Sequence, residues 1–313
     1  MIPALVLTAG LATRLRPLSF VRAKAAVPVA GEPLARRILR GLAAAGVTDA
    51  VLNLHHLPHT LTTLIGDGSD AGVRVRYSWE VPVLGSAGGP RRALPLLGSS
   101  TFLIVNGDTL TDIDVAAVVA DHRRSGARVT MAVVPNDDPA KYGGVVAGKD
   151  GAVTGFARRG STRESYLFVG IQVVEADAFA SVPDATPYES VGALYPALIE
   201  ARPGSVRACV TSGELLDIGT PDDYLRTSLL LGAREDSPLL GRNAHVHPSA
   251  RLEQSVLWDD VEVGEGTMLR QCVVTDGVRV PADTSWIGVT MRRPNGELAP
   301  GERVIDGMAI CSL

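Results

Sequence analysis

A turn rich in small residues follows an apolar run near the start of the chain and carries the first chemical signal. Residues 3–7 are apolar, which is typical of a buried parallel strand. Ala9 and Gly10 follow, and small side chains leave backbone N–H groups exposed, where they can bind phosphate. Arg14 and Lys24 are too far apart in sequence to share one helix face, but they can approach a bound anion from opposite sides. The segment predicts a phosphate-binding loop that matches neither a Walker loop nor the dinucleotide fingerprint.

Two aspartates stand where predicted strands end. The apolar run 102–105 predicts a central strand, and Asp108 follows it after a glycine. Asp217 ends a later short strand, just before Thr220, which is a good N-cap for the helix that follows it. A capping or turn role suits Asp112 or Asp114 better, because the helix that follows begins at about residue 115. Asp108 and Asp217 are therefore the carboxylates expected at a ligand site.

Strands and helices alternate over the first two thirds of the chain. Apolar periodicity and turn residues predict helices over 34–42, 57–65, 93–97, 115–122 and 191–199, and strands over 50–54, 73–77, 102–105, 129–134 and 206–210. Such alternation predicts an α/β fold with a doubly wound, mostly parallel (Rossmann-like) sheet. Ligands bind such sheets at the carboxyl ends of the strands. Between two elements, residues 84–90 contain three glycines and predict a loop that a flat ring can approach closely.

The last part of the chain is repetitive. Valines recur at a step of 17 residues, at Val246, Val263 and Val280. Leu252, Leu269 and Trp286 repeat at the same step. Short apolar-centred units of this kind predict a β-helix, here of about two coils. So few coils are expected to pack on the preceding domain or on a second subunit.

Composition limits the classes of protein to which the chain can belong. Its 313 residues favour two domains, and with 46% hydrophobic residues, 20% charged residues and a net charge of −4 it has no basic surface for nucleic acid. Its three cysteines, Cys209, Cys272 and Cys311, suggest neither a disulfide framework nor a zinc site. The apolar runs are too short for a signal peptide or a membrane span. We therefore expect a cytoplasmic protein that binds neither nucleic acid nor a membrane.

The signature segment, residues 10–33, resembles that of the sugar-1-phosphate nucleotidyltransferases. It reads Gly-Leu-Ala-Thr-Arg-Leu-Arg-Pro-Leu-Ser from Gly10 to Ser19, with Lys24 and Val-Pro-Val-Ala-Gly-Glu-Pro from residue 27. The resemblance continues to about Tyr224. Leu-Gly-Ser-Ala-Gly from residue 84 is similar to the base-binding loop of the family. Two departures are Ala12 in place of the second glycine and Ala23 in place of the proline before the lysine.

The resemblance implies roles for particular residues. Arg14, Lys24 and Asp108 would be catalytic, and Asp108 and Asp217 would hold Mg²⁺. The nucleotide would be bound by Ala9, Gly10, Leu11, Ala12, Thr13, Gly85, Ser86 and Gly88, and the sugar phosphate by Gly143, Arg158, Arg159 and Gly170. Where relatives have Phe-x-Glu-Lys-Pro, this chain has Arg158 and Arg159. Arg159 can replace the lysine as a phosphate ligand, whereas Arg158 cannot accept hydrogen bonds as the glutamate does.

The predicted function is the transfer of a nucleoside monophosphate from an NTP to a sugar-1-phosphate. Within the family the chain resembles the mannose-1-phosphate guanylyltransferases, so the expected pair is GTP and mannose-1-phosphate. One alternative is a uridylyl- or thymidylyltransferase acting on glucose-1-phosphate or N-acetylmuramate-1-phosphate. Another is a non-catalytic homologue that binds nucleotide sugars and regulates a partner. The expected domains are catalytic (1–233), a linker (234–243) and a left-handed β-helix tail (244–313), through which copies would form a homo-oligomer.

Overall fold

The computed structural model describes residues 2–313, which divide into two compact units. The first unit comprises the residues up to Gly10, Arg37–Pro58 and Ile65–Leu216. The second comprises Leu11–Arg36, His59–Leu64 and Asp217–Leu313. The second unit therefore combines most of the signature segment with the C-terminal repeats, which are far apart in sequence.

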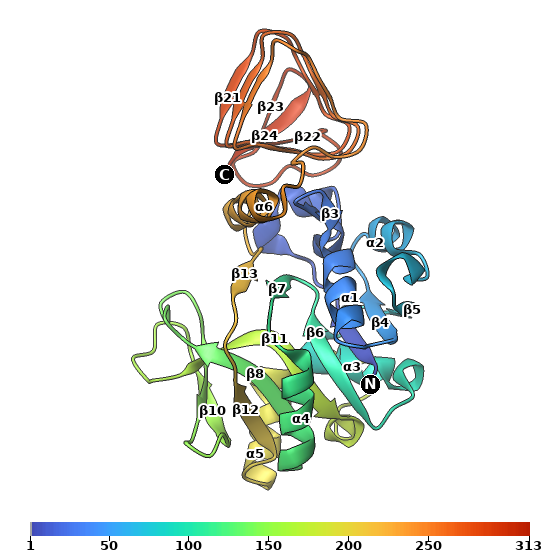
Figure 1. The fold of residues 1–313 in the computed structure, drawn as a ribbon, viewed down its shortest axis with the longest axis vertical. Coiled ribbons are helices and arrows are strands. Elements are labelled where there is room, and N and C mark those ends of the chain that lie inside the picture. Colours follow the sequence, from blue (N-terminus) through green and yellow to red (C-terminus); the bar gives the residue numbers. More distant parts are fainter. Residues whose placement is uncertain (1) are drawn as a thin grey trace. The chain divides into compact units, whose positions relative to one another are not determined.

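A nine-stranded mixed sheet forms the centre of the first unit (Figure 1). Its strands are β1 (Ala4–Leu7), β4 (Asp49–Leu54), β5 (Arg74–Trp79), β6 (Thr101–Asn106), β8 (Val129–Pro135), β9 (Gly144–Ala147), β10 (Val153–Ala157), β11 (Tyr166–Glu175) and β12 (Val206–Val210). The strands β6, β1, β4 and β5 are adjacent and parallel. The long β11 is antiparallel to both β6 and β8. The α/β, Rossmann-like fold is confirmed, with β11 as an antiparallel insertion that the alternation of elements did not predict.

Helices cover this sheet and provide the connections between its strands. The helices of the chain are α1 (Leu34–Ala44), α2 (Pro58–Ile65), α3 (Gly85–Leu97), α4 (Val115–Ser125), α5 (Tyr195–Ala201) and α6 (Pro221–Glu235). Within the first unit, α3 packs on β1 and β4, and α4 packs on β8 and β11. The capping predictions are confirmed: Asp114 Oδ1 accepts from the Ala117 N–H at 3.1 Å, and Thr220 Oγ1 accepts from the Asp223 N–H at 3.1 Å.

The loop expected at residues 84–90 is wrong, because α3 already begins at Gly85. The Ala87 and Gly88 N–H groups donate to the carbonyl oxygen of Tyr188, at 2.8 and 3.1 Å. The first N–H groups of a helix have no partner within the helix, so an acceptor from elsewhere in the fold stabilises this turn. The low helix propensity of the glycines is therefore overcome by a contact that the local sequence does not reveal.

The C-terminal part of the second unit is a small β-helix, drawn in Figure 1 as a triangular coil. Its strands are β14 (His245–Val246), β15 (Arg251–Glu253), β16 (Val256–Leu257), β17 (Glu262–Val263), β18 (Met268–Arg270), β19 (Val273–Val274), β20 (Arg279–Val280), β21 (Ser285–Ile287), β22 (Val289–Arg292), β23 (Arg303–Ile305) and β24 (Met308–Ser312). Parallel pairs such as Val246–Val263–Val280 confirm the 17-residue repeat. Each face stacks three strands in parallel, so the expected number of about two coils is wrong.

Buried apolar side chains hold each unit together. Phe102, Ile104 and Met131 lie in the core of the first unit, and Val263, Leu269 and Val280 in that of the β-helix. The remaining short strands are β2 (Pro28–Val29), β3 (Glu32–Pro33), β7 (Thr109–Thr111) and β13 (Leu215–Asp217). Across residues 2–313, no helix has the length and apolar character needed to cross a membrane.

Candidate active site

In the first unit, the carboxyl ends of β1 and β6 lie side by side. The strands are parallel, with Leu7 opposite Asn106. The Gly107 N–H donates to the Leu7 carbonyl oxygen at 3.0 Å. A Cβ atom at residue 107 would lie 2.6 Å from that oxygen, so the approach requires glycine. The structure thereby brings the start of the predicted phosphate loop next to the segment that carries Asp108.

Asp108 and Gly170 also belong to this edge of the sheet. The half-buried carboxylate of Asp108 accepts a hydrogen bond from Thr109 Oγ1 at 3.2 Å. Gly170 lies on β11 with a φ of +78°, and a Cβ there would be 3.0 Å from the Cβ of Asn106. This left-handed conformation and the close approach both favour glycine. The sequence-predicted residues Gly10, Asp108 and Gly170 thus follow or flank neighbouring strands of one sheet.

A buried polar network fixes the first turn of the phosphate loop. Asn53 Oδ1 accepts from the Thr8 and Ala9 N–H groups, at 2.6 and 3.3 Å, and the Thr8 hydroxyl donates to the Asn53 carbonyl oxygen. Asn53 Nδ2 donates to Glu80 Oε1 at 2.7 Å, and Glu80 Oε2 accepts from the Leu84 N–H at 2.8 Å. Glu80 is only 1% exposed. The Ala9 amide is therefore engaged with Asn53.

This network connects the phosphate loop to the start of α3, and sequence reasoning missed both Asn53 and Glu80. Both belong to the first unit, at and just after the carboxyl ends of β4 and β5. Their position at strand ends could have identified them from the sequence, because polar side chains there face the ligand-binding edge of such a sheet.

The predicted base-binding residues contact a second segment of the first unit. Ser86 Oγ donates to Glu189 Oε2 at 2.7 Å and accepts from the Ser190 N–H at 2.8 Å. A Cβ at Gly85 would lie 2.7 Å from Glu189 Oε1, and one at Gly88 would lie 2.5 Å from the Thr186 carbonyl oxygen. The glycines therefore let residues 186–190 lie against α3, a packing reason that the sequence did not suggest. Their role toward a base stays a prediction.

Three of the predicted sugar-phosphate residues, all but Gly170, lie at one end of the β9–β10 pair. Gly143 precedes β9, and a Cβ there would be 3.0 Å from the Ala157 carbonyl oxygen. Arg158 and Arg159 directly follow β10, and both are exposed. Two guanidinium groups are thus available to an anionic ligand at this end of the sheet.

The second unit contains Leu11, Ala12, Thr13, Arg14, Lys24 and Asp217. Ala12 has a φ of 48° and a ψ of 45°, the left-handed region that glycine adopts more easily. Its carbonyl oxygen accepts from Ser19 Oγ at 2.9 Å and from the Leu15 N–H at 3.0 Å. The structure therefore retains the turn where the family has glycine, with alanine in a strained conformation.

The three charged residues of the second unit that were predicted for the site differ in exposure. Arg14 is exposed in a short 3₁₀ turn, Thr13–Leu15, and Lys24 is half-buried at the start of another, Lys24–Ala26. Asp217 is half-buried at the end of β13, and its carbonyl oxygen accepts from Thr227 Oγ1 at 2.8 Å. The backbone at Asp217 is therefore fixed from α6.

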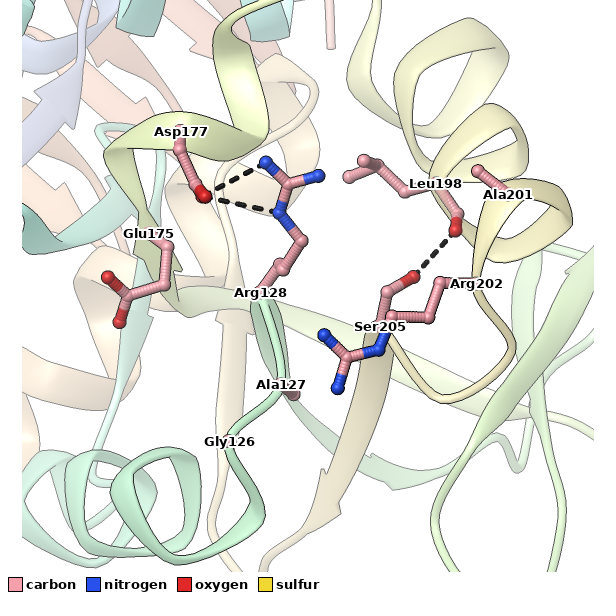
Figure 2. Close-up of a pocket in the computed structure, with 9 residues that line it drawn as sticks. All are labelled: Gly126, Ala127, Arg128, Glu175, Asp177, Leu198, Ala201, Arg202 and Ser205. Carbon is pink, nitrogen blue, oxygen red and sulfur yellow. Dashed lines mark hydrogen bonds and ion pairs between the residues drawn. The ribbon is translucent and has the colours of Figure 1, made fainter.

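A separate pocket of about 480 Å³ lies at the opposite edge of the first unit's sheet (Figure 2). Glu175 ends β11 there, and Arg128 directly precedes β8. Figure 2 shows Arg128 beside Asp177, with Arg128 Nε 3.2 Å from Asp177 Oδ1. Ser205 Oγ donates to the Leu198 carbonyl oxygen at 2.7 Å. The described lining includes none of the sequence-predicted site residues, and the Glu175 carboxylate bonds Thr101 and His122 outside it.

Comparisons with known proteins agree with both parts of the chain. The family model described as nucleotidyl transferase matches residues 3–233, and the model described as GlmU-like, C-terminal hexapeptide matches residues 226–296. The hexapeptide match fits the β-helix of the second unit.

Related proteins extend these matches over most of the chain. A mannose-1-phosphate guanylyltransferase of Mycobacterium tuberculosis is 30% identical, over 90% of this chain and 82% of its own. A UTP–glucose-1-phosphate uridylyltransferase of Synechocystis is 27% identical, over 98% of this chain and 82% of its own. The crystal structure of HddC from Yersinia pseudotuberculosis, at 22% identity, matches 74% of this chain and all of its own with a TM-score of 0.65. The chain therefore belongs to the nucleotidyl transferase family, as an enzyme of the sugar-1-phosphate nucleotidyltransferase type.

Proposed function

We propose that this enzyme transfers GMP from GTP to mannose-1-phosphate, giving GDP-mannose and pyrophosphate. The supporting observation is the 30% identity to the guanylyltransferase of M. tuberculosis, which extends over 90% of this chain. A phosphate oxygen of the sugar-1-phosphate attacks the α-phosphorus of the nucleotide, and pyrophosphate leaves. Because both reactants are anions, the protein has to align them and offset their repulsion.

The chain's own residues supply those functions in this proposal. Arg14 stabilises the negative charge that moves onto pyrophosphate, and Lys24 contacts the reacting phosphates. Gly10 and the residues after it hold the triphosphate through backbone N–H groups, since the Ala9 amide already bonds Asn53. Arg159 binds the phosphate of the sugar substrate with its planar guanidinium, in the place of the family lysine.

The proposed cofactor is Mg²⁺, held by Asp108 and Asp217. Carboxylate oxygens are the protein ligands that magnesium prefers, and enzyme sites for phosphate transfer use one or two of them together with substrate phosphates. The described residues contain no group of three or more histidine, cysteine or acidic side chains placed to hold a metal. Asp108 and Asp217 are both half-buried, and in this proposal the substrate phosphates complete the coordination of the ion. When bound, the ion would offset the charge of both phosphate substrates.

A matrix of substrates tests the proposal. The enzyme is incubated with Mg²⁺, each of GTP, UTP, dTTP and ATP, and a panel of sugar-1-phosphates that includes those of mannose, glucose and N-acetylmuramate. Pyrophosphate release is then measured. The highest kcat/KM is expected for GTP with mannose-1-phosphate. A higher value for UTP or dTTP with glucose-1-phosphate would replace this proposal with the uridylyl- or thymidylyltransferase alternative, which the relative from Synechocystis favours.

Asp108→Asn tests the carboxylate. If Asp108 holds the ion, turnover should fall at least ~100-fold, because a neutral amide is a much poorer magnesium ligand. Asp114→Asn is the matched control, since asparagine caps a helix as well as aspartate does. Turnover close to wild type in the Asp108 variant would remove the assignment.

We also propose that copies of the enzyme associate through the β-helix. Ile287 is 51% exposed and Val304 is 53% exposed, both on strands of this part of the second unit. Large apolar side chains that are exposed in this way are candidates for contacts with another copy. Light scattering of the purified enzyme should give a multiple of its 32.8 kDa mass, and Val304→Asp should lower it. A monomer at all concentrations would contradict this.

A further inference from the structure

A pair of stacked carboxylates stands on one corner of the β-helix. Asp259 and Asp276 occupy the same position of successive coils, 17 residues apart, and the Asp259 N–H donates to Asp276 Oδ1 at 3.1 Å. Arg242, one further repeat back, contributes its Nη2, 2.9 Å from Asp259 Oδ2. The repeat therefore places two negative charges next to each other, an arrangement that costs free energy unless a cation lies between them.

Arg22, from the signature segment, supplies that cation. Its Nε and Nη2 donate to the two oxygens of Asp276 at 2.7 and 2.6 Å, and Nη2 also lies 2.9 Å from Asp259 Oδ2. Arg22 is only 7% exposed, and its guanidinium lies 5.4 Å from the ring centre of Trp258. The bidentate contact with Asp276 and the stacking on Trp258 are specific to arginine, so lysine cannot reproduce them.

Residues next to Arg22 in the signature segment make further contacts that hold its backbone in place. Ala23 donates its N–H to Thr60 Oγ1 at 3.1 Å, and Lys24 follows at once. On the other side, the Phe20 ring lies 5.0 Å from the guanidinium carbon of the buried Arg292. All of these residues belong to the second unit. The backbone that carries Lys24 is thus held from the β-helix at two points.

We propose that Arg22 is a positioning residue through which the β-helix sets the placement of the segment from Ala12 to Lys24, and thereby the rate of nucleotidyl transfer. This inference rests on the proposed roles of Arg14 and Lys24. In this proposal the β-helix contributes to catalysis without contacting the substrate. Its carboxylates, Asp259 and Asp276, fix the backbone between the two proposed catalytic cations, Arg14 and Lys24.

The test compares conservative variants of the full-length enzyme. Arg22→Lys keeps the positive charge but loses the bidentate contact with Asp276. Asp276→Asn keeps the side-chain shape and leaves Arg22 with one carboxylate partner, Asp259. Arg279→Lys is the matched control, because Arg279 pairs with Glu262 on the exposed surface of the same β-helix. Each variant is measured for kcat and KM with the best substrate pair and for hydrogen exchange of peptides covering residues 11–26 and 256–291, well below its melting temperature.

The expected result is a fall in kcat of about tenfold in Arg22→Lys and Asp276→Asn, with KM changed less than about twofold, because the cations act on charge that develops in the transition state. Exchange in residues 11–26 should speed up about tenfold while residues 256–291 stay protected. The Arg279 variant should match wild type. Unchanged exchange in residues 11–26, or faster exchange with unchanged kcat, would overturn the inference.

Arg14→Gln separates this inference from the proposed function. A large loss of kcat in Arg14→Gln together with normal activity in Arg22→Lys and Asp276→Asn would overturn the positioning role and leave the proposed chemistry in place. Normal activity in Arg14→Gln would instead refute the proposed role of Arg14, whatever the exchange data show.

Discussion

Removal of a single buried hydroxyl, by Tyr224→Phe, should destabilise the second unit strongly. Tyr224 lies on α6 and is fully buried. Its hydroxyl donates to the Pro28 carbonyl oxygen at 2.6 Å and accepts from Trp258 Nε1 at 2.7 Å. It thus connects α6 to the signature segment and to the β-helix. Burial raises the pKa of Tyr224 above its usual value, so the hydroxyl stays protonated and able to donate.

The size of the effect follows from the two partners. Phenylalanine keeps the ring, whose centre lies 6.1 Å from that of Trp258, so the apolar packing changes little. The carbonyl oxygen of Pro28 and the indole N–H of Trp258 both lose a hydrogen bond inside the protein. Each buried polar group left without a partner costs about 1–3 kcal/mol, so for two groups we expect a loss of about 2–6 kcal/mol in the free energy of unfolding.

Chemical denaturation of the full chain, followed by circular dichroism, measures this loss as a lower midpoint. Tyr188→Phe is the control, because Tyr188 is only half-buried, and a change below about 0.5 kcal/mol is expected there. If Tyr224→Phe unfolded within about 0.5 kcal/mol of wild type, the hydroxyl would not be the shared link that its two short hydrogen bonds indicate.

Three further changes test local features. Ala12→Gly should stabilise the protein by about 0.5–1 kcal/mol in denaturant titrations, because residue 12 has a φ of 48°, and a loss of stability would contradict the strain. Gly107→Ala should lower kcat at least ~10-fold in steady-state assays, because its Cβ would lie 2.6 Å from the Leu7 carbonyl oxygen and displace Asp108, and normal kcat would refute this. Cys272 is fully buried, and burial raises the pKa of its thiol. Alkylation followed by mass spectrometry should therefore label it only after unfolding, and rapid labelling of the native protein would contradict this.

The sequence alone determined most of the local elements. Helix caps such as Asp114 and Thr220 act within one turn, and the apolar run of β6 is buried wherever it lies in the sheet. The 17-residue step of the tail fixed the register of the β-helix, because each coil packs on a neighbour with the same spacing of apolar residues. These features depend on residues close in sequence or on strict repetition, so periodicity and capping rules were enough to predict them.

The candidate site was predictable only as a set of residues. Residue types around Gly10 indicated phosphate binding, and the strand-end position of Asp108 indicated a ligand site. The arrangement of the site residues was not predictable, because it depends on contacts between residues far apart in sequence. The Ala9 N–H donates to Asn53, and the Ser86 hydroxyl donates to Glu189. Which hydrogen bonds a side chain makes depends on its neighbours in space.

Tertiary structure also decided which segments belong together. Residues 11–36 are joined to the C-terminal repeats in one unit, and Arg22 pairs with carboxylates more than 230 residues away. It likewise made α3 helical through the Tyr188 carbonyl oxygen, where the glycines favour a loop. The physical reason is the same in each case: buried charges and unpaired backbone groups need partners, and the fold, not the local sequence, brings those partners within reach.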